Sequence, residues 1–199
     1  MNAKKIIYSS LSLVVFAAAG LSIMQPVNAS AFGTVQLSPS FTQTYIATST
    51  FYTPPSSAGN IFWSHYGSSS KVVRILNISI SRVASGSGAD QYALTKRSSA
   101  ISGGSGASIS SVPVDSANAA ATGVVTQYTA APTAGANVGL IGSNVTAQTA
   151  VAANQSLYQC GNLEQALTLR GTSQGVDLAG VTALTGTIQV TEKYQESTN

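Results

Sequence analysis

Residues 71–84 (KVVRILNISISRVA) carry the pattern that most narrows the possible folds. Leu76, Ile78 and Ile80 lie on one face of an extended chain, and the polar residues between them lie on the other. A period of two is typical of a half-buried β-strand. This segment therefore predicts a strand that packs one face into an apolar core.

Other segments rich in β-branched and aromatic residues also predict strands, because such side chains fit a pleated surface. Turn residues such as Gly, Pro and Ser separate them, and no segment has a sustained helical period. The sequence thus predicts a single antiparallel β-sandwich of about eight strands, jelly-roll-like in its connections. The further predicted strands are residues 41–52, 60–66, 91–97, 124–128, 137–141, 144–151, the end of 161–170, 176–178 and 184–194.

Residues 1–29 predict a signal peptide. Lys4 and Lys5 precede an apolar stretch at residues 11–24, and the small residues of Val27-Asn28-Ala29 favour cleavage before Ser30. An apolar stretch of about 14 residues is shorter than the roughly 20 that cross a bilayer. Export to the cell surface or medium, with no membrane span after cleavage, is therefore expected; a retained membrane anchor is the alternative.

The mature chain, residues 30–199, is expected to form one domain. Residues 30–40 are mixed in character and predict an N-terminal arm or edge strand, and residues 192–199 predict a polar tail.

Charge is scarce in this chain. Asp, Glu, Lys and Arg make up 8% of it, compared with about 25% in ordinary globular domains. After removal of Lys4 and Lys5, seven basic residues face six acidic ones, and the basic residues are spread along the sequence. Nucleic-acid binding needs clustered Lys and Arg, so this composition argues against it. It favours a subunit that buries much of its surface in an assembly.

Residues 98–122 form a long Gly/Ser-rich stretch without a clear element, and such stretches often serve as functional or interface loops. Small side chains allow close approach between subunits. We expect this loop to form an interface between subunits. The candidate contact residues are the basic pair at its base, two adjacent glycines and an aspartate expected to cap a short helical turn. Lys96 and Arg97 are expected to pair with an acid on a neighbouring copy. The candidate interface residues are Lys96, Arg97, Gly103, Gly104 and Asp115.

Two stretches resemble a group of phage virion-associated proteins and their bacterial relatives. The first stretch lies within residues 94–135 and contains five motifs in this order: KRS at a strand end, GG in a loop, VPxDS, AAAT and YTA-PT-G. The second stretch is QALTLRGTSQG at residues 165–175. Together they cover about a third of the mature chain. The resemblance implies a non-enzymatic β-sandwich subunit of a surface assembly. Virion proteins do not normally carry a cleavable signal peptide, so the resemblance favours an exported, cell-encoded version.

Residues that could carry chemistry are few. A Ser–His–Asp triad would have to use His65, the one histidine, which is expected to be structural or at the surface. Cys160 is the one cysteine, so an internal disulfide is excluded; it is either a buried apolar residue or a bridge to another subunit. We predict no catalytic residues, metal site or cofactor. The acids lack a recognisable motif; they are Asp90, Asp115, Glu164, Asp177, Glu192 and Glu196.

The sequence leaves two functional hypotheses. The first is a non-enzymatic structural or surface-assembly subunit that acts by self-association, with a trimer and a filament both open. The second is a carbohydrate-binding module that contacts cell-surface glycans through exposed aromatic rings. The candidate residues for glycan stacking are Trp63, Tyr66 and Tyr52, whose alternative role is in the core.

Overall fold

The computed structural model describes residues 42–83, 89–146 and 155–198. They lie in the compact unit Phe41–Asn199, whereas the signal peptide and arm predicted at residues 1–40 lie outside the described part. The described residues hold one short 3₁₀-helix, Leu163–Gln165, and no helix among them is long and apolar enough to span a bilayer. The strands are β1 (Gln43–Thr48), β2 (Ile61–Tyr66), β3 (Lys71–Val83), β4 (Asp90–Arg97), β5 (Ser105–Ile109), β6 (Ser111–Pro113), β7 (Val124–Ala130), β8 (Asn137–Thr146), β9 (Gln155–Gln159), β10 (Leu167–Arg170), β11 (Gly175–Gly180) and β12 (Thr187–Thr198).

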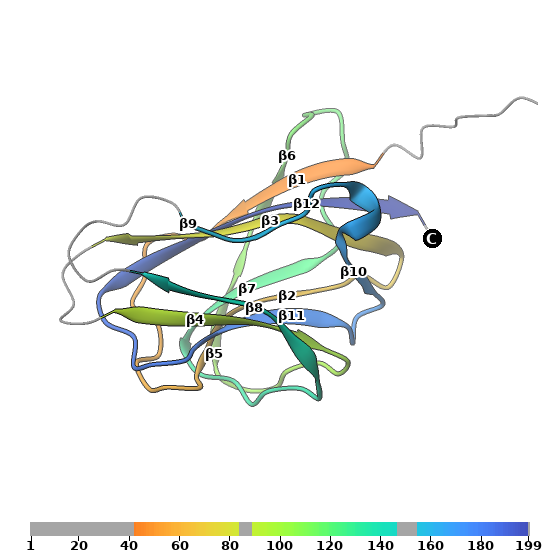
Figure 1. Ribbon diagram of the computed structural model, residues 1–199. Coiled ribbons are helices and arrows are strands. Elements are labelled where there is room, and N and C mark those ends of the chain that lie inside the picture. Colours follow the sequence, from red (N-terminus) through yellow and green to blue (C-terminus); the bar gives the residue numbers. More distant parts are fainter. Residues whose placement is uncertain (1–41, 84–88, 147–154, 199) are drawn as a thin grey trace, which may run out of the picture. The chain divides into compact units, whose positions relative to one another are not determined.

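These strands form two antiparallel sheets packed face to face (Figure 1). Sheet 1 has the order β10-β3-β12-β1-β6, with β9 also paired to β3; sheet 2 has the order β5-β7-β2-β11-β4-β8. Without β5, β6 and β7, the orders become β1-β12-β3-β9/β10 and β2-β11-β4-β8. That is the strand order of a jelly roll, with eight framework positions. The predicted β-sandwich is therefore confirmed.

The remaining three strands belong to an insertion between β4 and β8, residues 98–136. It adds β7 and β5 to sheet 2 beside β2, and β6 to sheet 1 beside β1. Only Ser110 separates β5 from β6, so the chain passes from one sheet to the other within a single residue. The prediction of residues 98–122 as a loop without regular structure is therefore wrong.

The core lies between the sheets and follows the predicted alternation, with one change of phase. Along β3, Ile78 and Ile80 are buried as expected, but Leu76 is not; Val73 and Ile75 are buried instead. The register with β12 shifts beside Leu76, since Tyr194 pairs with Ile75 and Lys193 with Asn77. A β-bulge inserts one residue and reverses the facing of all that follow, which explains the misplaced Leu76.

Strand β12 overturns the predicted polar tail at residues 192–199. It continues to Thr198, and every second side chain points into the core up to Glu196. Glu192 and Glu196 lie on the same face as Ile188, Val190 and Tyr194 and are 0% and 1% exposed. The two glutamates are therefore interior residues of a central strand.

Other differences concern weakly patterned segments. The two strands predicted around residues 137–151 are one strand, β8, as far as the description reaches at Thr146. Strand β9 was not predicted. Asp115 caps a tight turn rather than a helical one: its carboxylate accepts from Ala117 N (2.9 Å) and its carbonyl from Asn118 N (3.0 Å).

Candidate functional site

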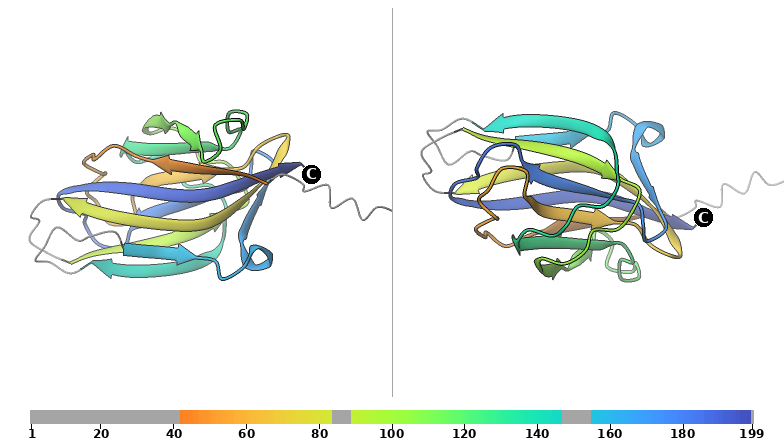
Figure 2. Two further views of the ribbon diagram at one scale, coloured as in Figure 1. Left: turned by 90° about the horizontal axis from the view of Figure 1, so that it is seen from above. Right: turned by 90° about the horizontal axis from the view of Figure 1, so that it is seen from below.

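The insertion is a closed excursion from the β4–β8 pair. Arg97 and Asn137 are register partners at its base, and Ser98 N donates to Ala136 O at 3.0 Å. Its first and last parts cross the outer face of sheet 2, as the view from below shows (Figure 2). Ser102 and Thr133 join these parts by two backbone hydrogen bonds. The insertion, residues 98–136, is therefore ordered, and the parts of it that cross sheet 2 are called the strap below.

The strap covers polar residues that would otherwise face solvent. Tyr66, Tyr128 and Asp177 lie on the outer face of sheet 2, since each alternates with inward-facing neighbours, yet they are 9%, 7% and 0% exposed. Burial raises the pKa of the Tyr66 hydroxyl to about 12, and the charge of Asp177 adds to the rise. The outer face of sheet 2 thus forms a second, partly polar layer under the strap.

Arg97 ties this layer to the strap. Its Nε and Nη2 donate to the two carboxylate oxygens of Asp177 at 2.5 and 3.1 Å, and its Nη1 donates to Gly135 O at 3.3 Å. Burial raises the pKa of the Asp177 carboxyl group, and the hydrogen bond from Arg97 only partly offsets this rise. The same hydrogen bond raises the pKa of Arg97. The carboxylate partner expected on a neighbouring copy is thus found within the chain. Lys96 likewise donates internally, to Thr168 O at 3.2 Å.

Two glycines shape the turn before β5. Gly103 and Gly104 adopt φ of 69° and 77°, a region that side chains disfavour. A Cβ on Gly104 would also lie 2.7 Å from Ala130 O. The glycine pair is therefore required by the backbone path into β5, and its place in an interface stays a prediction.

A buried acidic cluster binds the insertion just before β7. The Glu196 carboxylate accepts from Thr122 N (2.8 Å), Thr122 Oγ1 (2.9 Å) and Gly123 N (2.7 Å). Nearby, His65 Nδ1 lies 2.9 Å from both carboxylate oxygens of Glu192, and both side chains are fully buried. His65 Nε2 has no hydrogen-bond partner among the described residues. His65 is therefore structural, and the cluster anchors the start of β7.

Gly123 leaves no room for a side chain beside this cluster. A Cβ there would lie 2.5 Å from His65 Nε2 and 3.2 Å from Val73 Cγ2. We expect Gly123→Ala to lower the free energy of unfolding by about 1–3 kcal/mol, since overpacking forces the neighbours apart. Urea unfolding measures the loss. Gly139→Ala is the matched control, because a Cβ at Gly139 meets no atom within 4 Å; equal effects of the two substitutions would contradict the prediction.

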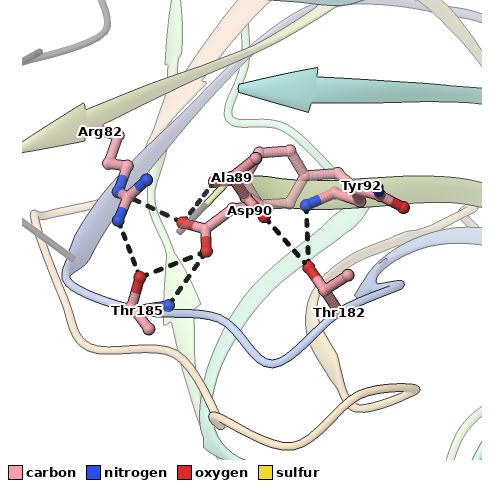
Figure 3. Close-up of polar contacts among 7 residues, drawn as sticks. Arg82, Ala89, Asp90, Tyr92, Thr182 and Thr185 are labelled. Carbon is pink, nitrogen blue, oxygen red and sulfur yellow. Dashed lines mark hydrogen bonds and ion pairs between the residues drawn. The ribbon is translucent and has the colours of Figure 1, made fainter. Parts of the chain in front are cut away.

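A third buried charge pair lies at the opposite end of the sandwich (Figure 3). Arg82 Nε is 3.2 Å from Asp90 Oδ2, and Arg82 Nη2 donates to Thr185 Oγ1 at 2.8 Å. Asp90 Oδ1 accepts from Thr185 N at 3.2 Å, while Thr182 Oγ1 accepts from Gln91 N at 3.2 Å. These contacts fix the β11–β12 connection to β3 and β4, so this cluster is also structural.

The aromatic residues considered for glycan stacking are buried. Trp63 is 0% exposed and Tyr52 is 7% exposed, with its hydroxyl donating to Phe62 O at 2.6 Å. Tyr66 lies under the strap. None of the three presents a ring face to a sugar, so the carbohydrate-binding hypothesis loses the residues on which it rested.

Cys160 is partly exposed rather than fully buried, so its interpretation as a buried apolar residue is wrong. It lines a surface cavity of about 320 Å³ together with Asn77, Leu163 and Lys193. A bridge from Cys160 to another subunit remains a prediction.

The acids, considered together, are mainly structural. Asp90, Asp177, Glu192 and Glu196 are each at most 1% exposed and have partners, whereas Asp115 and Glu164 are exposed. In the described ranges, no three His, Cys, Asp or Glu residues lie close enough to hold a metal ion. Signals for two of the buried acids were present in the sequence: Glu192 and Glu196 keep the phase of Ile188 and Val190.

No protein-family model, curated protein or solved structure matches this chain.

Proposed function

We propose that this chain is an exported, non-enzymatic structural subunit that acts by self-association at a surface. The observation that carries the proposal is the distribution of charge on the folded domain. Between Arg97 and Glu164 the sequence has one charged residue, Asp115. That span supplies the insertion and both edge strands of sheet 2. Charge-depleted, exposed edges favour association with other chains.

Exposed aliphatic side chains on the same span support the proposal. Val112, Val114, Val124, Val138 and Leu140 are between 51% and 63% exposed. Scattered exposed apolar residues are ordinary, but here they occur on a surface with almost no charge. The internal pairing of four carboxylates and of His65 also leaves few groups for surface catalysis. The resemblance to virion-associated subunits fits the same role.

The insertion supplies the test. We expect the mature chain, residues 30–199, to form a homo-oligomer in light scattering under reducing conditions. Deletion of residues 103–110, which removes β5, should reduce the mass to that of a single chain. Cooperative urea unfolding of the deletion variant checks that the sandwich remains folded. Cys160→Ser is the control for disulfide-linked association and should leave the oligomer unchanged. An oligomer of unaltered size after the deletion would contradict the role of the insertion.

A further inference from the structure

We propose that sheet 2 continues from one copy of this chain into the next, with β8 of one copy pairing with β5 of its neighbour. The inference rests on the proposed self-association and identifies the two surfaces that meet. It predicts a head-to-tail contact, which makes a ring where the rotation closes and a filament where it does not.

The edges of the two sheets differ in how well they resist pairing. Natural edge strands are protected by shortness, proline, charge or β-bulges. In sheet 1, β6 has three residues and ends at Pro113. The other edge, beside β3, holds β10, which has four residues and ends at Arg170, and β9 (QSLYQ), which has neither proline nor charge. In sheet 2, β5 (SGASI) and β8 (NVGLIGSNVT) hold neither proline nor a charged residue. Sheet 2 is therefore the sheet in which neither edge strand holds proline or charge; the protection that these edges have is the register shifts of β8 against β4 and of β5 against β7.

The direction of the strands permits head-to-tail pairing. Sheet 2 has six strands, all antiparallel to their neighbours, so its first and last strands run in opposite directions. When a second copy is placed beside the first in the same orientation, β8 meets β5 antiparallel. That is the pairing of every neighbouring strand pair described in this chain. No reversal of the second copy is needed.

The outward side chains of the two edges are complementary in size. Leu140 pairs with Thr95, and Thr95 with Asp177, so Leu140 and Val138 face outward on sheet 2. They are 63% and 59% exposed. On β5, the residues on this same face are small.

The small residues are Gly106 and Ser108, which pair with Tyr128 and Thr126 on the outer side of β7. A contact between two β5 edges would bury only such small side chains. A β8–β5 contact instead places Val138 and Leu140 beside Gly106 and the Tyr128 ring, whose Cε1 would lie 2.8 Å from a Cβ on Gly106. The apolar area that it buries is therefore larger than that of a β5–β5 contact, and burial of apolar area drives association.

Two single substitutions test the contact in the mature chain. Leu140→Lys places a charge on the β8 edge, and Ser108→Glu places one on the β5 edge. Each variant alone should have the mass of a single chain. An equimolar mixture should at least double that mass, because Leu140→Lys chains keep an intact β5 and Ser108→Glu chains keep an intact β8. Recovery on mixing is the signature of a contact between two different surfaces.

The control is Leu163→Lys, the same substitution at a leucine that is 50% exposed outside sheet 2; it should leave the assembly unchanged. Circular dichroism and urea unfolding check each fold, and Val138→Lys replaces Leu140→Lys if that variant unfolds. A closed dimer of the wild type, assembly of either single variant, or a mixture that stays monomeric would overturn the edge pairing. A monomeric wild type would instead refute the proposed function itself.

Discussion

Glu196→Ala is expected to lower the free energy of unfolding by about 3 kcal/mol or more. The carboxylate is 1% exposed and accepts hydrogen bonds from Thr122 and Gly123. Its removal leaves two backbone amides and a hydroxyl without their acceptor, and each buried unsatisfied group costs about 1–3 kcal/mol. The expected loss is below the sum because water can enter the space that the side chain leaves. Urea unfolding of residues 30–199 measures the difference.

Two further variants sharpen this test. Glu196→Gln keeps one carbonyl oxygen as an acceptor, so its effect should fall between those of the wild type and Glu196→Ala. Glu164→Ala removes an exposed glutamate and should change stability by about 0.5 kcal/mol or less. If Glu196→Ala behaves like Glu164→Ala, the carboxylate does not anchor the insertion.

Arg97→Ala is expected to cost about 3–5 kcal/mol, the usual loss when one partner of a buried ion pair is removed. Asp177 is fully buried, so without the guanidinium that now binds both of its oxygens its carboxyl group either stays charged with no counter-ion or takes up a proton, and both lower the stability. The strap would also lose the bond from Arg97 to Gly135. We therefore expect faster proteolysis within residues 98–104 together with the lower stability.

The matched control is Arg170→Ala. It removes an exposed arginine at the end of β10 and should change the free energy of unfolding little. A double-mutant cycle with Asp177→Ala isolates the pair. The double variant should lose less than the sum of the single losses, since removal of both partners leaves no buried charge uncompensated. Additive losses would show that Arg97 and Asp177 do not act together.

Much of the fold was predictable from local pattern. A period of two located β3 and most of β12, because one buried face is enough to impose alternation on a strand. Turn residues marked most strand boundaries. The pattern failed at Leu76 and in residues 98–122. A bulge reverses the facing of a strand without any sequence signal, and β5 has no apolar face, since its first four residues are exposed. Strand β5 forms because β7 offers it a partner.

The candidate site was predictable only in part. Low charge and small side chains pointed to residues 98–122. However, Asp177, Glu192 and Gly123, the partners of Arg97, His65 and Glu196, are between 73 and 127 residues away from them in the sequence. Such pairs depend on which strands become neighbours. Trp63 illustrates the same limit, because an aromatic residue on a strand suits either a core or a binding surface until its face is known.

The sequence by itself determined the all-β class, the two-layer sandwich and the scarcity of surface charge. These follow from side-chain periodicity and composition, which act locally and need no partner. The tertiary structure decided which acids are buried, that the insertion crosses from one sheet to the other, and that both edges of sheet 2 lack charge. The physical reason is that burial and edge position belong to pairs of strands, and antiparallel pairing joins residues that lie far apart in the chain.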